Sequence, residues 1–323
     1  MSDELLVVEG LVKEFGDLRA VDDVSFTVRR GETFGIVGES GCGKSTLSRA
    51  ILRLLEPTAG RVTFDGIDVR ALGPADLRRL RSRMQIVFQD PLGSLDPRMT
   101  ARAIVEEPLE IHGVGDRAAR VRRAAEMLEL VGIPSGQHAR KPHAFSGGQR
   151  QRIGVARALV LEPELVFLDE PISALDVSIQ AQVLNLLRRL QTELSLTYVF
   201  IVHDLAVAEY FCDRVAVLYR GAVMETGSSE ALFREPLHPY TTSLLSAVPI
   251  PDPEVERRRR HIVLRGDVAS APQPATGCRF RPRCPVGHDR EVCAREAPPL
   301  AEHRPGHAAA CHFAGELHAT EAA

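Results

Sequence analysis

A glycine-rich stretch near the N-terminus, GESGCGKS at residues 38–45, combines the residue types of a loop that binds phosphate groups. Small residues let backbone N–H groups wrap around phosphates, and the helix expected after the loop adds a favourable field at its N-terminus. In this spacing Lys44 reaches the β- and γ-phosphates of a nucleotide, and the hydroxyl of Ser45 binds Mg²⁺. An apolar strand before the loop and an apolar helix after it favour a nucleotide site over a chance glycine-rich turn. The residues expected to contact ATP are Gly38, Glu39, Ser40, Gly41, Cys42, Gly43, Lys44, Ser45 and Thr46.

Two adjacent acidic residues, Asp169 and Glu170, end the apolar run LVFLDE. At the carboxyl end of a buried strand, Asp169 is positioned to hold Mg²⁺, directly or through water, and Glu170 can polarise the water that attacks the γ-phosphate. An acidic pair at a strand end is commonly only solvated. The phosphate loop in the same chain makes a catalytic pair the favoured interpretation.

Three further polar patterns indicate a nucleotide site only when they are considered together with the phosphate loop and the acidic pair. Gln89 follows MQIVF and His203 follows YVFIV, so both are expected at the carboxyl ends of strands, where α/β sheets place their ligands. Alone, each would be interpreted as a structural polar residue. The stretch AFSGGQRQR places Ser146, Gly147 and Gly148 before an expected helix, and such a loop offers amides and a hydroxyl to a phosphate.

The elements that must position these residues can be read from apolar spacing. The first ninety residues are expected to form strands and turns, with a hairpin at Asp65–Gly66 because that dipeptide tolerates positive φ. Helical spacing predicts a helical subdomain at about 91–155. The continuous apolar runs ELVFLDE and TYVFIVHD predict buried parallel strands, and the helix between them is expected to begin with Ser178 as its N-cap. Together these elements predict a parallel α/β core, closed by a second hairpin at Arg220–Gly221.

Composition narrows the class of protein. With 323 residues, 44% of them apolar and 26% charged, the chain suits one large globular domain or two unequal ones. A formal net charge of −3 does not by itself call for a nucleic-acid partner. No apolar run approaches the ~18 residues of a membrane span, and the acidic start MSDELLVVEG lacks the features of a signal peptide, so a cytoplasmic protein is expected. In that reducing compartment the six cysteines are not expected to form disulfides.

Six motifs, taken in order over residues 5–235, resemble the ATP-binding subunits of ABC transporters. They are GESGCGKST, VFQDP with Gln89, FSGGQRQR, LVFLDEP, SALD at 173–176 and VHDL with His203. The resemblance implies an α/β fold, a P-loop ABC ATPase of residues 1–235 with a RecA-like core, an antiparallel β subdomain and a helical subdomain. It also implies that Phe15 stacks on adenine, that Gln89 links Mg²⁺ and the attacking water to a membrane partner, and that His203 touches the γ-phosphate.

The resemblance also assigns the SGGQ loop to a neighbouring subunit's nucleotide. In this family that loop binds ATP in trans, which implies such a role for Ser146, Gly147, Gly148 and Gln149, and Asp176 would contact the opposite subunit. Each ATP would join two subunits, and hydrolysis would weaken their attraction. The partners implied are a sister ATP-binding subunit in a heterodimer, two permease subunits and an extracytoplasmic peptide-binding protein. The chain would then lie peripherally at the cytoplasmic face of the cell membrane.

Residues 236–323 resemble the C-terminal extension of the ATP-binding subunits of oligopeptide and dipeptide importers. The shared pattern runs HPYT, GCxFxxRCP, a third cysteine and a final CH, and PDPEVERRRRHIVLRGDV resembles the F-type subunit, whose sister is D-type. This resemblance implies that the chain hydrolyses ATP to power the import of di- or oligopeptides.

Four cysteines of this extension, Cys278, Cys284, Cys293 and Cys311, lack the close CxxC pairs common in zinc sites. Four thiolates can instead hold a [4Fe-4S] cluster, which the family's cysteine set suggests. Zinc, with His307 or His312 assisting, and unliganded thiols are the alternatives. A bound metal would hold together a proline-rich segment, so a structural or redox-sensing role is expected.

Other functions stay open at this point. The ATPase of an importer does not touch the cargo, so a nickel complex or another small solute is an alternative to peptides. A soluble ABC ATPase acting on DNA or ribosomes is less favoured, because the segment between Gln89 and Ser146 is too short for a coiled coil. An exporter's ATPase is disfavoured because exporters usually fuse this domain to membrane helices.

Overall fold

The computed structural model describes residues 3–249 and 276–317, together with positions 252, 254, 257, 262 and 264. The stretch 251–268, on which the F-type assignment depends, thus lies almost entirely outside the described residues. The chain forms two compact units. One contains Met1–Leu6, Val28–Glu32 and Thr63–Ile201, and the other contains Val7–Thr27, Thr33–Val62 and Val202–Ala323.

An N-terminal sheet of four strands has the order β2-β1-β4-β5. Its strands are β1 (Glu4–Phe15), β2 (Leu18–Arg29), β4 (Ala59–Phe64) and β5 (Ile67–Asp68). β4 and β5 are antiparallel with Phe64 opposite Ile67, and the two turn residues Asp65 and Gly66 have φ of 48° and 77°. The hairpin expected there is confirmed, with the turn type that the dipeptide favours.

The first unit contains parallel strands in the order β8-β7-β6. They are β6 (Met84–Val87), β7 (Leu165–Asp169) and β8 (Thr197–Val202), and every residue of β7 and β8 is buried. This burial explains why both strands are continuously apolar. The predicted parallel α/β core is confirmed.

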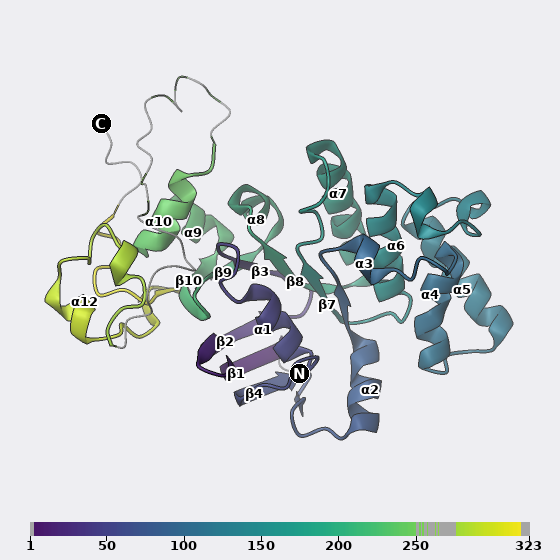
Figure 1. Cartoon of the computed structure of the whole chain (residues 1–323), viewed down its shortest axis with the longest axis horizontal. Helices are drawn as coiled ribbons and strands as arrows, with labels where there is room; N and C mark the ends of the chain where they lie inside the picture. The colour runs from purple at the N-terminus through teal and green to yellow at the C-terminus, as the bar shows by residue number, and fades with distance from the viewer. Residues whose placement is uncertain are drawn as a thin grey trace. The chain divides into compact units, whose positions relative to one another are not determined.

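Helices fill the segment between β6 and β7. The predicted helical subdomain contains α3 (Pro91–Ser94), α4 (Ala101–Ile111), α5 (Arg117–Leu130), two short 3₁₀ turns at Ser135–Gln137 and Pro142–Ala144, and α6 (Gly147–Leu159). Thr100 and Asp116 cap α4 and α5, because their side chains accept hydrogen bonds from backbone N–H groups in the first turn of each helix. Figure 1 shows α4, α5 and α6 gathered in one cluster.

The helix between β7 and β8 begins earlier than its sequence indicates. α7 spans Val177–Leu194, and its N-cap is Asp176, so the expectation that Ser178 caps it is wrong. Ser178 lies inside the first turn, where serine is also tolerated. The expected apolar face is present, because Val183, Leu186 and Leu190 are all buried.

The second unit contains the successive strands β11-β12-β10-β9-β3. β3 (Thr33–Val37) runs parallel to β9 (Arg214–Tyr219), which forms an antiparallel hairpin with β10 (Ala222–Ser228). The turn residues Arg220 and Gly221 both have positive φ, so the second predicted hairpin is confirmed. Three helices accompany these strands: α1 (Lys44–Ile51), α8 (Leu205–Phe211) and α9 (Ser229–Arg234).

The C-terminal segment, residues 276–317, adds two strands to this sheet, which its proline-rich sequence does not predict. After α10 (Pro239–Ser246), it contains a 3₁₀ turn at Arg281–Arg283, α12 (Glu291–Arg295), β11 (Ala301–Arg304) and β12 (His307–Ala309). β12 pairs antiparallel with β10, with Glu225 opposite Ala309, and β11 pairs with β12. Figure 1 shows this segment in yellow near α9, α10 and β10. No helix in the described part of the chain is both long and apolar enough to span a membrane.

A ring of two arginines and two acids links distant segments of the first unit. Arg83 donates to Glu164 (2.5 Å) and also pairs with Asp65, and Arg30 pairs with the same two acids. The hydrogen bond from Arg83 is the main reason why the pKa values of Asp65 and Glu164 are lowered. The ring thus favours the ionised carboxylates in the folded state.

Replacing Arg83 should therefore make stability less dependent on pH. Groups with lowered folded pKa values stabilise the protein above their unfolded pKa values, near pH 4, and lose that contribution as pH falls through the folded values. Because the side chains are about one-third exposed, we expect Arg83→Gln to cost about 1 kcal/mol at pH 7. The difference from the unmodified chain should shrink below about pH 4.5 in urea unfolding curves.

Arg79→Gln is the matched control, because Arg79 pairs with Asp76 on the exposed face of α2 (Pro74–Arg83). A stability difference for Arg83→Gln that stays constant from pH 7 down to the acid limit of folding would contradict the proposed role of the ring.

Candidate functional site

The phosphate loop connects β3 to α1, as its sequence predicts. The Lys44 ammonium is buried and donates to the carbonyl oxygens of Gly38 (2.8 Å) and Glu39 (3.0 Å) within the same loop. Gly43 ends the loop with φ of 106°, and a Cβ there would collide with the Ala20 carbonyl oxygen. Glycine is thus required at this position by both backbone conformation and space. Burial raises the pKa of the neighbouring Cys42 thiol, so this cysteine is a neutral packing group.

The two acids lie where the sequence places them, at the end of β7. Asp169 is 1% exposed and is the last residue of the strand. Glu170 follows with φ of 47°, an uncommon conformation for a residue with a side chain, and its N–H donates to the Ile201 carbonyl. Its carboxylate accepts a hydrogen bond of 2.8 Å from the Gln89 amide. The structure therefore brings together two of the three residues predicted to be catalytic.

The SGGQ loop forms the N-terminus of α6. Ser146 accepts the N–H of Gln149, and the Gln149 side chain accepts the N–H of Ser146, which makes a complete capping box. A Cβ on Gly148 would lie 2.5 Å from the Ile179 side chain, so this glycine allows α6 and α7 to approach closely. Leu175 lies 3.3 Å from a Cβ placed on Gly147, and the next residue, Asp176, is the N-cap of α7. The role of these residues toward a partner's nucleotide stays a prediction.

Phe15 and His203 are both placed at accessible positions. Phe15 ends β1 with 48% of its surface exposed, and the Lys13 ammonium lies 4.8 Å from its ring centre. His203 directly follows β8, is exposed, and precedes α8, which Asp204 caps. A stacking role for Phe15 and a phosphate-sensing role for His203 stay predictions.

A contact absent from the sequence predictions joins the phosphate loop to the C-terminal segment. Arg283 donates from both terminal nitrogens to the two carboxylate oxygens of Glu39, at 2.7 Å and 3.0 Å. The N–H of Glu39 donates to the hydroxyl of Tyr240 in α10 (3.1 Å). The two residues of the ion pair are 244 positions apart, and no local pattern relates them.

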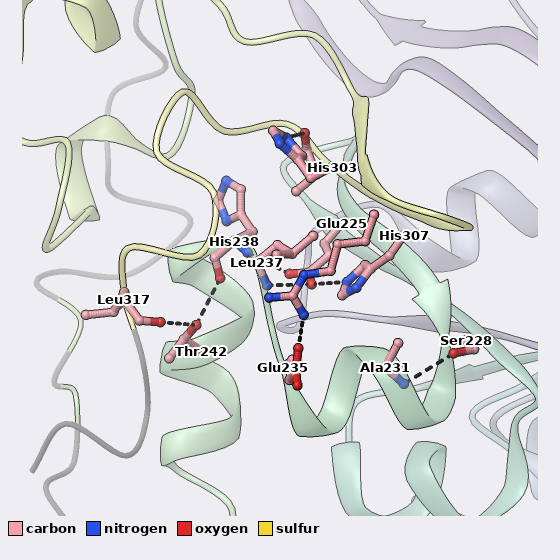
Figure 2. A network of polar contacts seen from close by, with 12 residues as sticks. Glu225, Ser228, Ala231, Glu235, Leu237, His238, Thr242, His303, His307 and Leu317 are labelled. Carbon is pink, nitrogen blue, oxygen red and sulfur yellow. Dashed lines mark hydrogen bonds and ion pairs between the residues drawn. The ribbon is translucent and has the colours of Figure 1, made fainter.

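A second buried acid anchors the same segment. Glu225 of β10 is fully buried, and its oxygens accept hydrogen bonds from the N–H groups of Leu237 (2.8 Å) and His238 (2.9 Å). One of these oxygens also lies 2.7 Å from Nε2 of His307 in β12. Figure 2 shows Glu225 between His307 and the Leu237–His238 segment. Nearby, an exposed pair joins Arg304 of β11 to Glu235.

The four C-terminal cysteines surround one cavity of about 10 Å³. This space suits about one water molecule. The Cys284 and Cys311 sulfurs accept hydrogen bonds from the N–H groups of Gly287 and Phe313, and a Cβ on Gly287 would lie 2.8 Å from the Cys293 sulfur. Burial raises the pKa of all four thiols, that of Cys311 to about 12. The convergence agrees with a shared role for these cysteines.

A metal site at these cysteines finds no support in the side-chain positions. Among the described residues, no three His, Cys, Asp or Glu side chains are placed so that they could hold one metal ion. His307 Nε2 is engaged with Glu225, and Nε2 of His312, which lines the same cavity as the cysteines, bonds the Glu296 carbonyl (3.0 Å), so both Nε2 atoms already have partners.

Comparisons with known proteins decide the family. The model for "ABC transporter" matches residues 21–173, and the model for "Oligopeptide/dipeptide transporter, C-terminal region" matches residues 224–293. A peptide import ATP-binding protein of Brucella ovis is 55% identical over 311 residues, which is 95% of this chain and 97% of that protein. The chain belongs to the ABC transporter family. Within it, the oligopeptide transport ATP-binding protein AppF of Bacillus subtilis is 49% identical over 93% of this chain and 91% of its own length.

Solved ABC structures agree with the fold. The ATP-binding cassette MJ0796, described as a dimer in a post-hydrolysis state bound to ADP and phosphate, is 32% identical with a TM-score of 0.63, over 70% of this chain and 99% of that one. CbiO1 from Clostridium perfringens, part of the transporter complex CbiONQ, is 30% identical with a TM-score of 0.65, over 72% of this chain and 92% of its own. The predicted P-loop ABC ATPase fold and the ATPase activity that the motifs imply are thus confirmed.

Removing the Glu225 carboxylate should strongly destabilise this ABC subunit. Glu225→Ala leaves two buried N–H groups and the His307 ring without their acceptor, and breaking a buried charged network costs about 3–5 kcal/mol. Urea unfolding followed by circular dichroism measures the loss.

Glu235→Ala is the control, because it removes the exposed partner of Arg304 and should cost less than about 1 kcal/mol. Equal losses in the two variants would show that Glu225 does not anchor the segment.

Proposed function

We propose that this subunit hydrolyses ATP to power the import of di- or oligopeptides. The observation that carries the proposal is the C-terminal region shared with oligopeptide and dipeptide transporters, together with close relatives whose names specify peptide import. The F-type assignment is supported by the relative AppF. In the proposed complex the chain pairs with a D-type sister subunit and two permeases at the cytoplasmic face of the membrane, and a peptide-binding protein delivers the cargo.

The chemistry proposed for ATP hydrolysis assigns each step to a group of this chain. The Lys44 ammonium and the loop amides bind the phosphates, and Ser45, Gln89 and Asp169 would hold Mg²⁺, which neutralises phosphate charge. Glu170 accepts a proton from the attacking water. The Gln89 amide, which donates to Glu170, orients that carboxylate and transmits the position of the membrane partner. Ser146 and its glycines complete the site of the sister subunit.

Glu170→Gln should abolish both ATP turnover and uptake while ATP still binds. A general base contributes about 10² to 10⁴ in rate, so phosphate release by the assembled transporter should fall at least 100-fold. Uptake of a labelled tripeptide into cells that carry the transporter should stop with it. Glu162→Gln is the control, because Glu162 is an exposed partner of Arg123 and should leave both rates unchanged.

Two results would overturn parts of this proposal. Turnover of Glu170→Gln at the rate of the unmodified protein would remove Glu170 as the base. Uptake of a nickel chelate in place of the tripeptide would assign the transporter to another cargo and leave the ATPase chemistry intact.

We further propose a [4Fe-4S] cluster at Cys278, Cys284, Cys293 and Cys311. The support is the convergence of four thiols, three of them buried, on one cavity and the N–H groups that face two of their sulfurs. A [4Fe-4S] cluster is held by four cysteine thiolates, and four cysteines line this cavity. The role proposed for it is structural or redox-sensing.

Anaerobically purified protein should then contain about four iron and four sulfide ions per chain and absorb broadly in the visible range. Cys284→Ser should lose both ions, whereas Cys212→Ser, which changes a buried cysteine of another segment, should keep them. Zinc in place of iron, or no metal in the anaerobic preparation, would exclude the cluster.

A further inference from the structure

An acidic residue stands in the loop that must receive a polyanion. Glu39 is the second residue of the phosphate loop, and its backbone carbonyl accepts a hydrogen bond from the Lys44 ammonium. A carboxylate in the loop that binds phosphate opposes the binding of ATP, because like charges repel over several ångströms in a partly buried site. The loop therefore needs a counter-charge for Glu39.

Arg283 supplies that counter-charge from the C-terminal segment. Its guanidinium forms a bidentate ion pair with the Glu39 carboxylate, which is the geometry in which arginine binds carboxylates most strongly. The Arg283 side chain is 4% exposed and that of Glu39 is 29% exposed, so water screens the pair weakly. The hydrogen bonds to Glu39 are also the main reason why the pKa of Arg283 is raised.

An aromatic cluster keeps the arginine in place. The rings of Tyr219, Tyr240 and Phe280 pack with centroids 4.8 to 5.3 Å apart, and the Arg283 guanidinium lies 5.8 Å from the centre of the Tyr219 ring. Tyr240 also accepts the N–H of Glu39. The acid is thus held at its backbone by α10 and at its side chain by the C-terminal segment.

We propose that Arg283 is a positioning residue of the ATP site, which neutralises Glu39 and holds it so that the phosphate loop can accept the nucleotide. The C-terminal segment is then a working part of the nucleotide site. Arg283 immediately precedes Cys284, so this role falls to the chain segment that bears the cysteine cavity.

A double-mutant cycle in the full-length chain tests the role of the charge. Binding of MgATP is measured by fluorescence titration, without permease or cargo, for Arg283→Ala, Glu39→Gln and the double variant. We expect Arg283→Ala to weaken ATP binding about tenfold, or about 1.4 kcal/mol, because it leaves the Glu39 carboxylate uncompensated. In the Glu39→Gln background the same substitution should change the dissociation constant less than about twofold, because no charge remains to be compensated.

Kinetics of the assembled transporter separate positioning from catalysis. Arg283→Ala should raise the KM for ATP and change kcat less than about twofold, because Arg283 pairs with Glu39 of the loop and takes no part in the proposed hydrolysis step. Arg304→Ala is the matched control. It removes another ion pair of the same segment, with Glu235, and should leave ATP binding unchanged.

Either of two results would overturn the proposal: ATP binding by Arg283→Ala equal to that of the unmodified chain, or an equal loss in the presence and absence of the Glu39 carboxylate. The second result would mean that Arg283 acts only by holding the segment together. Where alanine at this buried position prevents folding, Arg283→Gln serves the same cycle. The proposal rests on ATP binding by this chain, so failure of the unmodified chain to bind ATP would overturn the ATP site and the role of Arg283 together.

Discussion

The C-terminal segment is held by a carboxylate that folding removes from water. Glu225 is fully buried, and a buried ionisable group is tolerated only when its hydrogen bonds are complete. Its partners come from the start of α10 and from β12, so satisfying one acid joins β10 to two segments that follow it in the chain. β12 in turn pairs with β11, and Arg281 of the 3₁₀ turn lines the cysteine cavity.

Charge links this segment to the ATPase chemistry. Two acids of the second unit, the buried Glu225 and the half-buried Glu39, each face a group that the C-terminal segment supplies. In this ABC subunit the segment therefore contributes electrostatic contacts to the second unit, in addition to holding any metal that its cysteines bind.

Local patterns predicted much of the fold and of the ATP site. The hairpins at Asp65–Gly66 and Arg220–Gly221 could be predicted because a two-residue turn depends on its own backbone angles, and the phosphate loop because its chemistry lies within nine consecutive residues. The start of α7 was misplaced by two residues because serine is acceptable both as a cap and within the first turn. Long-range pairs could not be predicted. Nothing near Glu39 or Arg283 reveals that a basic residue 244 positions away faces the loop, and a three-residue strand such as β12 has no periodicity to detect.

The edge strand of the second unit, β11, helps to protect the protein against aggregation. Without β12, the seven-residue, largely buried β10 would present unpaired backbone groups to any passing strand, which is a common route to aggregation. The added hairpin replaces this edge with β11, four exposed residues that include Glu302 and Arg304, and short charged edges resist such pairing. Since β12 follows β10 by about eighty residues, a growing chain leaves this edge of β10 unpaired until those residues have been made, and an unpaired strand edge is prone to aggregate.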